Sequence, residues 1–320
     1  MRLALLGFGN VGRAFARLLA QEKSAYPFRI TGVATARHGA AFSEKGIGPD
    51  TELKEAFQGV DAFLERTRPD IFLELTTLNP ASGEPAISHI RTAFGCGSHV
   101  VTANKGPIAY AYSDLCAEAR ASGVEFRFES TCMDGAPVFN MVRNCLPAVR
   151  VLGFTGVLNS TSKVAIDAMR AGRSMEEGLN EARAMGIAEA DASYDIDGWD
   201  SAAKTAALAN VLMNARMTPA QVDRRGIGGV TTGEVQALAR ERKTICLVSR
   251  ARAVGDRIIL ETHPQVLDDT DLMASVHGTS NLLLLHTDLM GTVGTVSIAP
   301  SVDQTAYGVF SDVVDIARSL

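Results

Sequence analysis

The first twelve residues constrain the fold more than any other part of the chain. A short apolar run, Leu3 to Leu6, leads directly into Gly7-Phe8-Gly9-Asn10-Val11-Gly12, and a helical pattern follows. A strand, a GxGxxG turn and a helix in this order are typical of dinucleotide-binding folds. Gly7 permits the tight turn, Gly9 lets the backbone approach a pyrophosphate, and Gly12 allows close helix–strand packing. The alternative is a glycine-rich turn in an unrelated α/β protein.

Short apolar runs alternate with longer mixed segments over the first 130 residues, which is a βαβ rhythm. Continuous apolar strands are typical of a parallel sheet buried on both faces. We therefore predict an α/β, Rossmann-type dinucleotide-binding domain over residues 1–135. Its expected strands are Leu3–Leu6, Arg29–Ala34, Ile71–Leu75, His99–Thr102 and Val124–Phe128, and its expected helices are Val11–Glu22, Glu84–Phe94 and Ile108–Ala121.

The pattern of predicted elements changes after about residue 136. Helical stretches rich in Ala and Met lie between strand candidates, which predicts an α+β domain with a mixed or antiparallel sheet over residues 136–299. A last amphipathic helix is expected at Thr305–Leu320. The other expected helices are Lys163–Met169, Met175–Met185 and Ser201–Met213, and the strands are Arg150–Leu158, Arg257–His263 and Asn281–Ile298.

Composition excludes several classes of protein. The 320 residues carry 31 Lys and Arg against 36 Asp and Glu. The net charge of −5 therefore indicates no basic surface that would neutralise the phosphates of a nucleic acid. No apolar run approaches the roughly 18 residues of a membrane span. Five scattered cysteines without a CxxC pair indicate neither a disulfide framework nor a thiolate zinc site. We expect a cytoplasmic protein with a small-molecule substrate.

The end of the second predicted strand bears on cofactor choice. NAD-binding folds usually carry Asp or Glu there to bind the ribose hydroxyls. This chain has Val33-Ala34-Thr35-Ala36-Arg37-His38-Gly39 instead, and its next carboxylate is Glu44. Arg37 is placed to meet a 2′-phosphate, so we predict that NADP is preferred over NAD. The alternative is an exposed loop arginine that selects nothing.

Other candidate residues follow predicted strands at the edge where α/β folds bind ligands. Thr76, Thr77 and Asn79 come after the strand ending at Leu75. Asn104 and Lys105 come after the strand ending at Thr102. The residues expected to contact the cofactor are thus Gly7, Gly9, Asn10, Val11, Gly12, Arg37, Thr76, Thr77, Asn104 and Lys105.

The segment from Glu189 to Lys204 places five carboxylates and one lysine within sixteen residues. Asp200 and Lys204 are four apart at the start of a predicted helix, so they share one face. Alone, this pair is most simply a surface ion pair. A calcium loop starting at Ser193 is rejected, because its twelfth position holds Lys204 where a bidentate Glu is required.

Taken together, three parts of the sequence resemble the homoserine dehydrogenase family: Gly7–Gly12, Val101–Gly106 and the array Glu189-x5-Asp195-x4-Asp200-x3-Lys204. The resemblance covers nearly the whole chain, and the array is its most specific part. Two further segments, Glu129–Pro137 and Gly156–Thr161, are similar to the family's E-A-T-V-G-A-G-x-P and G-x-x-N-G-T segments.

The resemblance implies NAD(P)-dependent interconversion of L-homoserine and L-aspartate 4-semialdehyde, a step toward threonine and methionine. Lys204 and Lys105 would be the acid/base and carbonyl-polarising residues, converging on the nicotinamide, and Asp200 would aid proton transfer. Glu189 and Asp195 would recognise the substrate ammonium. The family also implies a homodimer or homotetramer, with strands near Asn281–Ile298 forming a dimer sheet. Residues 300–320 would complete the first domain, and no regulatory ACT domain is expected.

The family binds a monovalent cation through a carboxylate and main-chain carbonyls. By resemblance, Na⁺ or K⁺ would be held by Glu129 and the carbonyls of Cys132 and Asp134. The sequence departs from the family here, because Cys132-Met133-Asp134 replaces Val-Gly-Ala.

Two rival functions remain open from the sequence. One is another NAD(P)-dependent dehydrogenase of amino-acid metabolism, in which the Glu189–Lys204 array would be coincidental. The other is a dinucleotide-binding redox sensor without turnover, although a sensor needs no paired lysines in its crevice.

Overall fold

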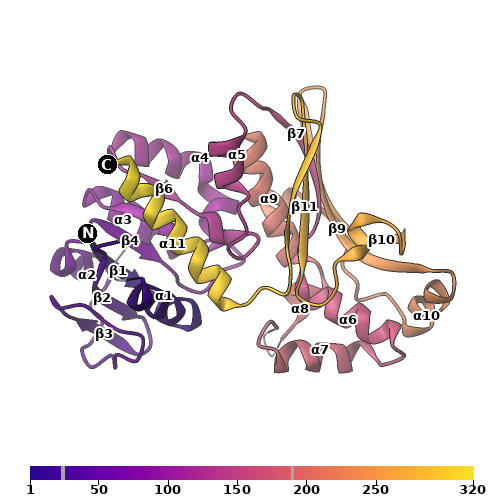
Figure 1. Cartoon of the computed structure of the whole chain (residues 1–320), viewed down its shortest axis with the longest axis horizontal. Coiled ribbons are helices and arrows are strands. Elements are labelled where there is room, and N and C mark those ends of the chain that lie inside the picture. The colour runs from indigo at the N-terminus through magenta and orange to yellow at the C-terminus, as the bar shows by residue number, and fades with distance from the viewer. Residues whose placement is uncertain (23–25, 189–190) are drawn as a thin grey trace. The chain divides into compact units, whose positions relative to one another are not determined.

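The computed structural model describes residues 1–22, 26–188 and 191–320. These residues form two compact units (Figure 1). Unit 1 comprises Met1–Asn140 and Ser301–Leu320, and unit 2 comprises Met141–Pro300. Each unit contains one six-stranded sheet.

The sheet of unit 1 has the strand order β3-β2-β1-β4-β5-β6. Its strands are β1 (Arg2–Leu6), β2 (Arg29–Thr35), β3 (Gly39–Phe42), β4 (Ile71–Glu74), β5 (His99–Thr102) and β6 (Phe126–Arg127). Five strands run parallel, and β3 pairs antiparallel with β2. The parallel sheet and its crossover helices confirm the predicted Rossmann-type α/β class.

The helices of unit 1 are α1 (Asn10–Gln21), α2 (Val60–Thr67), α3 (Ala86–Gly95), α4 (Lys105–Ala121) and α11 (Val302–Ser319), with the short η1 (Glu129–Thr131). Helix α5 (Phe139–Cys145) begins in unit 1 and ends in unit 2. Helices α1 and α11 share one core with β1: Phe15, Phe310 and Val313 pack with Leu3 and Leu5. The C-terminal helix therefore stabilises the sheet that carries the glycine-rich turn.

Unit 2 has the strand order β12-β11-β7-β9-β10-β8. Its strands are β7 (Val151–Val157), β8 (Asp223–Arg224), β9 (Lys243–Val254), β10 (Arg257–Asp268), β11 (Asn281–Thr287) and β12 (Thr292–Ser297). All neighbours pair antiparallel except β10 and β8, so the sheet is mixed, as predicted.

The central strand of this sheet, β9, is buried on both faces. Ile245 and Leu247 belong to one apolar cluster, whereas Cys246 and Val248 belong to another. The first cluster includes residues of α6 (Ser160–Arg170), α7 (Met175–Ala184), α8 (Ser193–Ile196) and α10 (Thr232–Arg240). The remaining elements of unit 2 are α9 (Trp199–Met213), η2 (Pro219–Gln221) and η3 (Leu272–Ser275).

Several elements differ from the sequence predictions. The expected strand Asn281–Ile298 is a hairpin, β11 and β12, which turns at residues 288–291. Helix α4 begins at Lys105 instead of Ile108, because Asn104 caps it by accepting a hydrogen bond from the Gly106 N–H at 3.0 Å. Strands β3 and β9 and helix α2 were not predicted.

Within the described ranges, no helix combines the length and apolarity needed to cross a membrane.

Candidate active site

The glycine-rich turn of unit 1 combines two tightly packed glycines with one open position. A Cβ on Gly7, whose φ is +103°, would lie 2.2 Å from the Leu75 carbonyl oxygen, and a Cβ on Gly12 would lie 2.6 Å from the Gly7 oxygen. A Cβ on Gly9 would meet nothing within 4 Å. The turn itself therefore requires Gly7 and Gly12, whereas Gly9 leaves space that a ligand could use.

Helix α1 starts directly after this turn with Asn10 and Val11. Its N-cap, Gly9, supplies no side-chain hydrogen bond. The first N–H groups of a helix have no partner within the helix, so this end offers donors to an anion. The geometry fits a dinucleotide pyrophosphate.

Arg37 lies in the exposed turn between β2 and β3. Leu6 pairs with Ala34, so this turn and the glycine-rich turn lie at the same edge of the sheet. Glu44 is held away from that edge, since it forms a two-pronged ion pair, 2.9 Å for each contact, with Arg2 at the opposite end of β1. An arginine without a competing ribose carboxylate fits a 2′-phosphate.

The carboxyl ends of β4 and β5 are joined by hydrogen bonds around Glu74, which is fully buried. Its carboxylate accepts hydrogen bonds from the N–H and hydroxyl of Thr76, and its carbonyl accepts one from the Thr102 hydroxyl at 2.9 Å. The Asn104 amide donates to the Thr76 carbonyl at 3.2 Å. The sequence interpretation missed Glu74, although a glutamate ending an apolar strand is a visible signal.

Two candidates at this edge are less buried than Asn104. Lys105, the first residue of α4, is half-buried, whereas Thr77 is exposed. Asn104 is only 5% exposed. Its side chain donates a hydrogen bond to the Thr76 carbonyl and accepts one from the Gly106 N–H. Asn104 therefore orders the loop that positions its neighbours.

Unit 2 gathers several predicted residues around Asn159, the N-cap of α6. The Asn159 Nδ2 group donates to Asp195 Oδ1 at 2.6 Å and to Asp200 Oδ2 at 2.9 Å, while its Oδ1 accepts from the Ser162 N–H at 2.7 Å. Asn159 is 2% exposed and Asp200 is 7% exposed. One buried amide thus fixes both carboxylates.

Lys204 completes this cluster. Its Nζ lies 3.1 Å from Asp200 Oδ2, and it donates to the Leu158 carbonyl at 2.8 Å. The predicted pairing of Asp200 and Lys204 along α9 is therefore present, but it is partly buried, unlike a surface ion pair. A lysine ammonium has three donors, so one N–H remains for a substrate oxygen. We call Asn159, Asp195, Asp200 and Lys204 the proton-transfer cluster, after the role proposed for it below.

Glu189, the other predicted substrate ligand, lies outside the described residues. Asp195 is half-buried at the end of α8. The sequence interpretation gave Asn159 no role, although an Asn directly before a helical pattern is a recognisable N-cap signal.

The carboxylate of Glu129, the expected cation ligand, is engaged by main-chain N–H groups. Its carboxylate accepts hydrogen bonds from the N–H groups of Val138, Phe139 and Asn140 at 2.6, 2.9 and 2.6 Å. Glu129 is 2% exposed and caps the start of α5. A carboxylate surrounded by N–H donors does not fit a cation.

Cys132 and Asp134 are expected to bind the cation through their main-chain carbonyls, and their side chains have other contacts. Cys132 is buried, with its sulfur 3.7 Å from the Thr131 hydroxyl, and Asp134 adopts a positive φ of 55° with Oδ1 3.5 Å from the Thr305 hydroxyl. Within residues 1–22, 26–188 and 191–320, no group of three or more His, Cys, Asp or Glu side chains could hold a metal ion.

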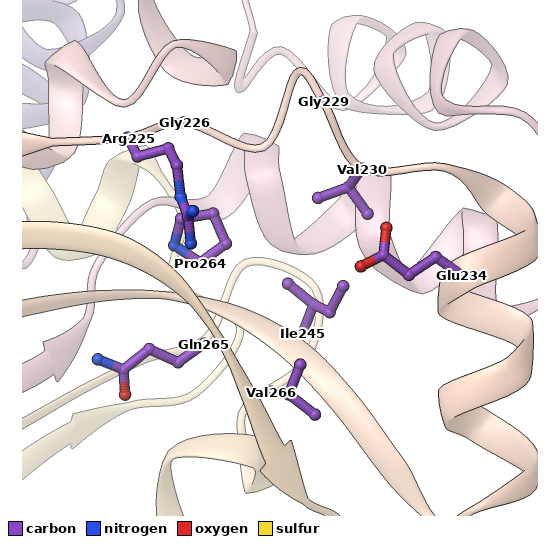
Figure 2. A pocket seen from close by; sticks show the side chains of 9 residues that line it. All are labelled: Arg225, Gly226, Gly229, Val230, Glu234, Ile245, Pro264, Gln265 and Val266. Atoms are coloured by element: carbon purple, nitrogen blue, oxygen red, sulfur yellow. The ribbon is translucent and has the colours of Figure 1, made fainter.

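A separate hollow of about 300 Å³ in unit 2 contains none of the predicted site residues (Figure 2). Arg225 and Glu234 lie on opposite sides of it, with Val230 and Ile245 between them. Both charged side chains are exposed, so an ion pair with a ligand there would contribute at most about 1 kcal/mol. The hollow therefore supports no ligand assignment.

Comparison with known proteins covers both units. The family model described as "Homoserine dehydrogenase, NAD binding domain" matches residues 7–129, and the model "Homoserine dehydrogenase" matches residues 137–314. A homoserine dehydrogenase from Sulfurisphaera tokodaii is 33% identical over 99% of both chains. An NAD(+)-dependent homoserine dehydrogenase from Pseudomonas canavaninivorans is 31% identical over 99% of this chain and 96% of the relative.

Solved structures agree. A homoserine dehydrogenase from Thiobacillus denitrificans has a TM-score of 0.87 at 28% identity, over 99% of this chain and 73% of that one. A putative homoserine dehydrogenase from Archaeoglobus fulgidus has a TM-score of 0.86 at 25% identity, over 99% of both chains.

Proposed function

This chain belongs to the homoserine dehydrogenase family, and we propose that it interconverts L-homoserine and L-aspartate 4-semialdehyde with a nicotinamide cofactor, a step toward threonine and methionine. The observation that carries the proposal is the proton-transfer cluster, in which a buried amide holds two carboxylates and one of them pairs with Lys204. A dinucleotide-binding sensor without turnover has no need of such a cluster.

The bound cofactor supplies or accepts a hydride at C4 of its nicotinamide. When the aldehyde is reduced, Lys204 donates a proton from Nζ to the carbonyl oxygen as the carbonyl carbon gains the hydride. When homoserine is oxidised, neutral Lys204 accepts the hydroxyl proton as the carbon loses the hydride. Asp200 holds the Lys204 amine in place in both directions.

Three further residues have proposed roles in binding the substrate. Lys105 polarises the carbonyl oxygen, whereas Asp195 and Glu189 neutralise the ammonium of the zwitterionic substrate. Asp195 suits this role because Asn159 fixes its orientation before the substrate arrives.

We propose that NADP is preferred and that Arg37 selects it. Two observations support this choice. Arg37 is exposed at the edge of the sheet that carries the glycine-rich turn, and Glu44 forms an ion pair with Arg2. The relative from Pseudomonas canavaninivorans is named as NAD(+)-dependent, so the choice needs its own test. We expect kcat/KM to be higher with NADP, and Arg37→Ala to lower it for NADP but not for NAD. An equal or higher value with NAD, unchanged by Arg37→Ala, contradicts this proposal.

We also propose that the enzyme works in the cytoplasm as a homodimer or homotetramer. Apolar side chains around the β11–β12 hairpin are exposed, including Leu289, Met290, Val296 and Ile298. Exposed apolar patches often mark subunit interfaces. Light scattering coupled to gel filtration measures the mass of the assembly, and a monomer at micromolar concentration contradicts the proposal.

The proposed reaction is tested by following the absorbance of reduced cofactor with L-homoserine and either NADP or NAD. Formation of reduced cofactor supports the function. Faster turnover of a different aldehyde or imine supports another dehydrogenase of amino-acid metabolism. Binding of NADPH without oxidation by aspartate semialdehyde supports the redox-sensor alternative.

A further inference from the structure

Lys163 is a buried lysine to which the proposed reaction assigns no part. It is 6% exposed and lies in the first turn of α6, four residues after the N-cap Asn159. Burying an ammonium carries a large desolvation cost, and the positive end of the helix dipole disfavours a cation in the first turn. Two unfavourable terms therefore act on Lys163, which makes a purely stabilising role a poor explanation.

The contacts of Lys163 lead to the proton-transfer cluster. Its Nζ donates to the Asn159 carbonyl at 3.0 Å and to Asn281 Oδ1 at 3.1 Å. Asn281 is itself 3% exposed, at the start of β11. The ammonium thus ties the N-cap of α6 to the sheet of unit 2.

Asn159 connects Lys163 to the carboxylates of the proton-transfer cluster. Its main chain is held by Lys163, and its side chain donates to Asp195 and Asp200. A shift of the Asn159 backbone would move the amide away from both carboxylates. Errors of about 1 Å in such positioning lower rates by up to about 10²-fold.

We propose that Lys163 is a positioning residue that holds Asn159, and through it Asp195 and Asp200, in the geometry needed for substrate binding and proton transfer. The proposal rests on the proposed dehydrogenase function. It differs from a structural role in one respect: the fold tolerates the loss of Lys163, whereas turnover does not.

The contacts also indicate a variant that removes the ammonium together with one of its acceptors. In Lys163→Met, the Asn159 carbonyl still accepts a hydrogen bond from the Ser162 hydroxyl, which lies 3.0 Å away. Asn281 Oδ1, by contrast, loses the hydrogen bond from the lysine. Loss of a hydrogen-bond donor at a buried acceptor destabilises the fold and would obscure an effect on turnover. The double variant Lys163→Met/Asn281→Leu removes the ammonium and the side-chain acceptor together.

The test compares Lys163→Met, the double variant and a control, Lys243→Met, which removes a more exposed lysine of unit 2. Steady-state kinetics gives kcat and KM, NADPH fluorescence gives cofactor affinity, and thermal unfolding gives Tm. We expect the double variant to keep its Tm within a few degrees of wild type and its NADPH affinity within twofold. Its kcat should fall at least about 10-fold, and the control should keep its kcat.

Two outcomes overturn the proposal: a folded double variant with kcat within twofold of wild type, or a double variant that fails to fold, since the latter assigns Lys163 to stability. A wild-type enzyme without homoserine turnover instead contradicts the proposed function. The two failures are therefore distinguishable.

Discussion

Asn159 is the residue on which the geometry of the proton-transfer cluster depends most. Its Nδ2 group bonds two carboxylates, and its Oδ1 caps α6 through the Ser162 N–H. Two carboxylates next to one another repel unless donors lie between them. Asn159 therefore offsets part of the repulsion between Asp195 and Asp200.

The substitution Asn159→Asp tests this interpretation with a side chain of the same shape. It replaces the donor by a third carboxylate, so we expect kcat to fall at least about 10-fold and Tm to fall as well. Asn214→Asp is a matched control, because Asn214 is an exposed C-cap of α9. Unchanged kcat in Asn159→Asp would show that this amide does not organise the carboxylates.

The sequence predicted the pairing of Asp200 with Lys204 but not its link to Asn159. The pair follows from helix geometry, because residues four apart face one another. Asn159 lies 36 and 41 residues from the carboxylates it holds, and the link forms only when β7, α8 and α9 pack together. Local spacing carries no information on such a contact. The hydrogen bond between Lys163 and Asn281 was unpredictable for the same reason.

At the scale of elements, Glu129 determines how α5 begins. Three N–H groups that would otherwise lack partners bond to its carboxylate. Hydrogen bonds to a charged group contribute about 1.5–3 kcal/mol each, so this cap is a substantial part of local stability.

We predict that Glu129→Gln lowers the free energy of unfolding by about 1–3 kcal/mol, because the neutral amide is a weaker acceptor and turns an NH₂ group toward the N–H donors. Urea unfolding at pH 7 measures this change. A variant as stable as wild type would contradict the capping role.

The same geometry predicts that activity does not depend on a monovalent cation at Glu129. The rate in sodium or potassium chloride should equal the rate in tetramethylammonium chloride at the same ionic strength. Specific activation by sodium or potassium, abolished in Glu129→Gln, would instead support the ligand role that the family resemblance implies.

Elements with clear periodicity were predictable, and elements defined by tertiary context were not. Parallel strands such as β1 and helices such as α1 carry strong local patterns. By contrast, β9 is buried on both faces and combines an apolar run with Ser249, Arg250 and Arg252, so its sequence alternates poorly. The four-residue β3 is stabilised only by pairing with β2.

At the scale of the whole molecule, the two units carry different parts of the proposed reaction. Unit 1 contains the glycine-rich turn and Arg37, and unit 2 contains the proton-transfer cluster. The overall stability of the chain also depends on groups far from either site.

One such group predicts a pH dependence of stability. Burial lowers the pKa of His99 below its usual 6.5, and its Nδ1 accepts a hydrogen bond from the Glu125 N–H at 2.9 Å. The unfolded chain binds a proton at His99 more readily, so this contribution is complete above pH 6.5 and is lost as the pH falls toward the folded pKa.

The measurement is the free energy of unfolding at pH 7, 6 and 5 for wild type and His99→Asn, which keeps an acceptor but does not titrate in this range. Wild type should lose more stability than the variant on acidification. Equal losses in the two proteins would assign the pH dependence to other groups.

The most direct test of the whole account is the turnover of Lys204→Met with homoserine and NADP. We predict that kcat falls at least about 10²-fold, the lower range for a positioned proton-transfer group, while NADPH binding measured by fluorescence stays as in wild type. A Lys204→Met enzyme that retains most of its kcat would contradict the assignment of proton transfer to this cluster.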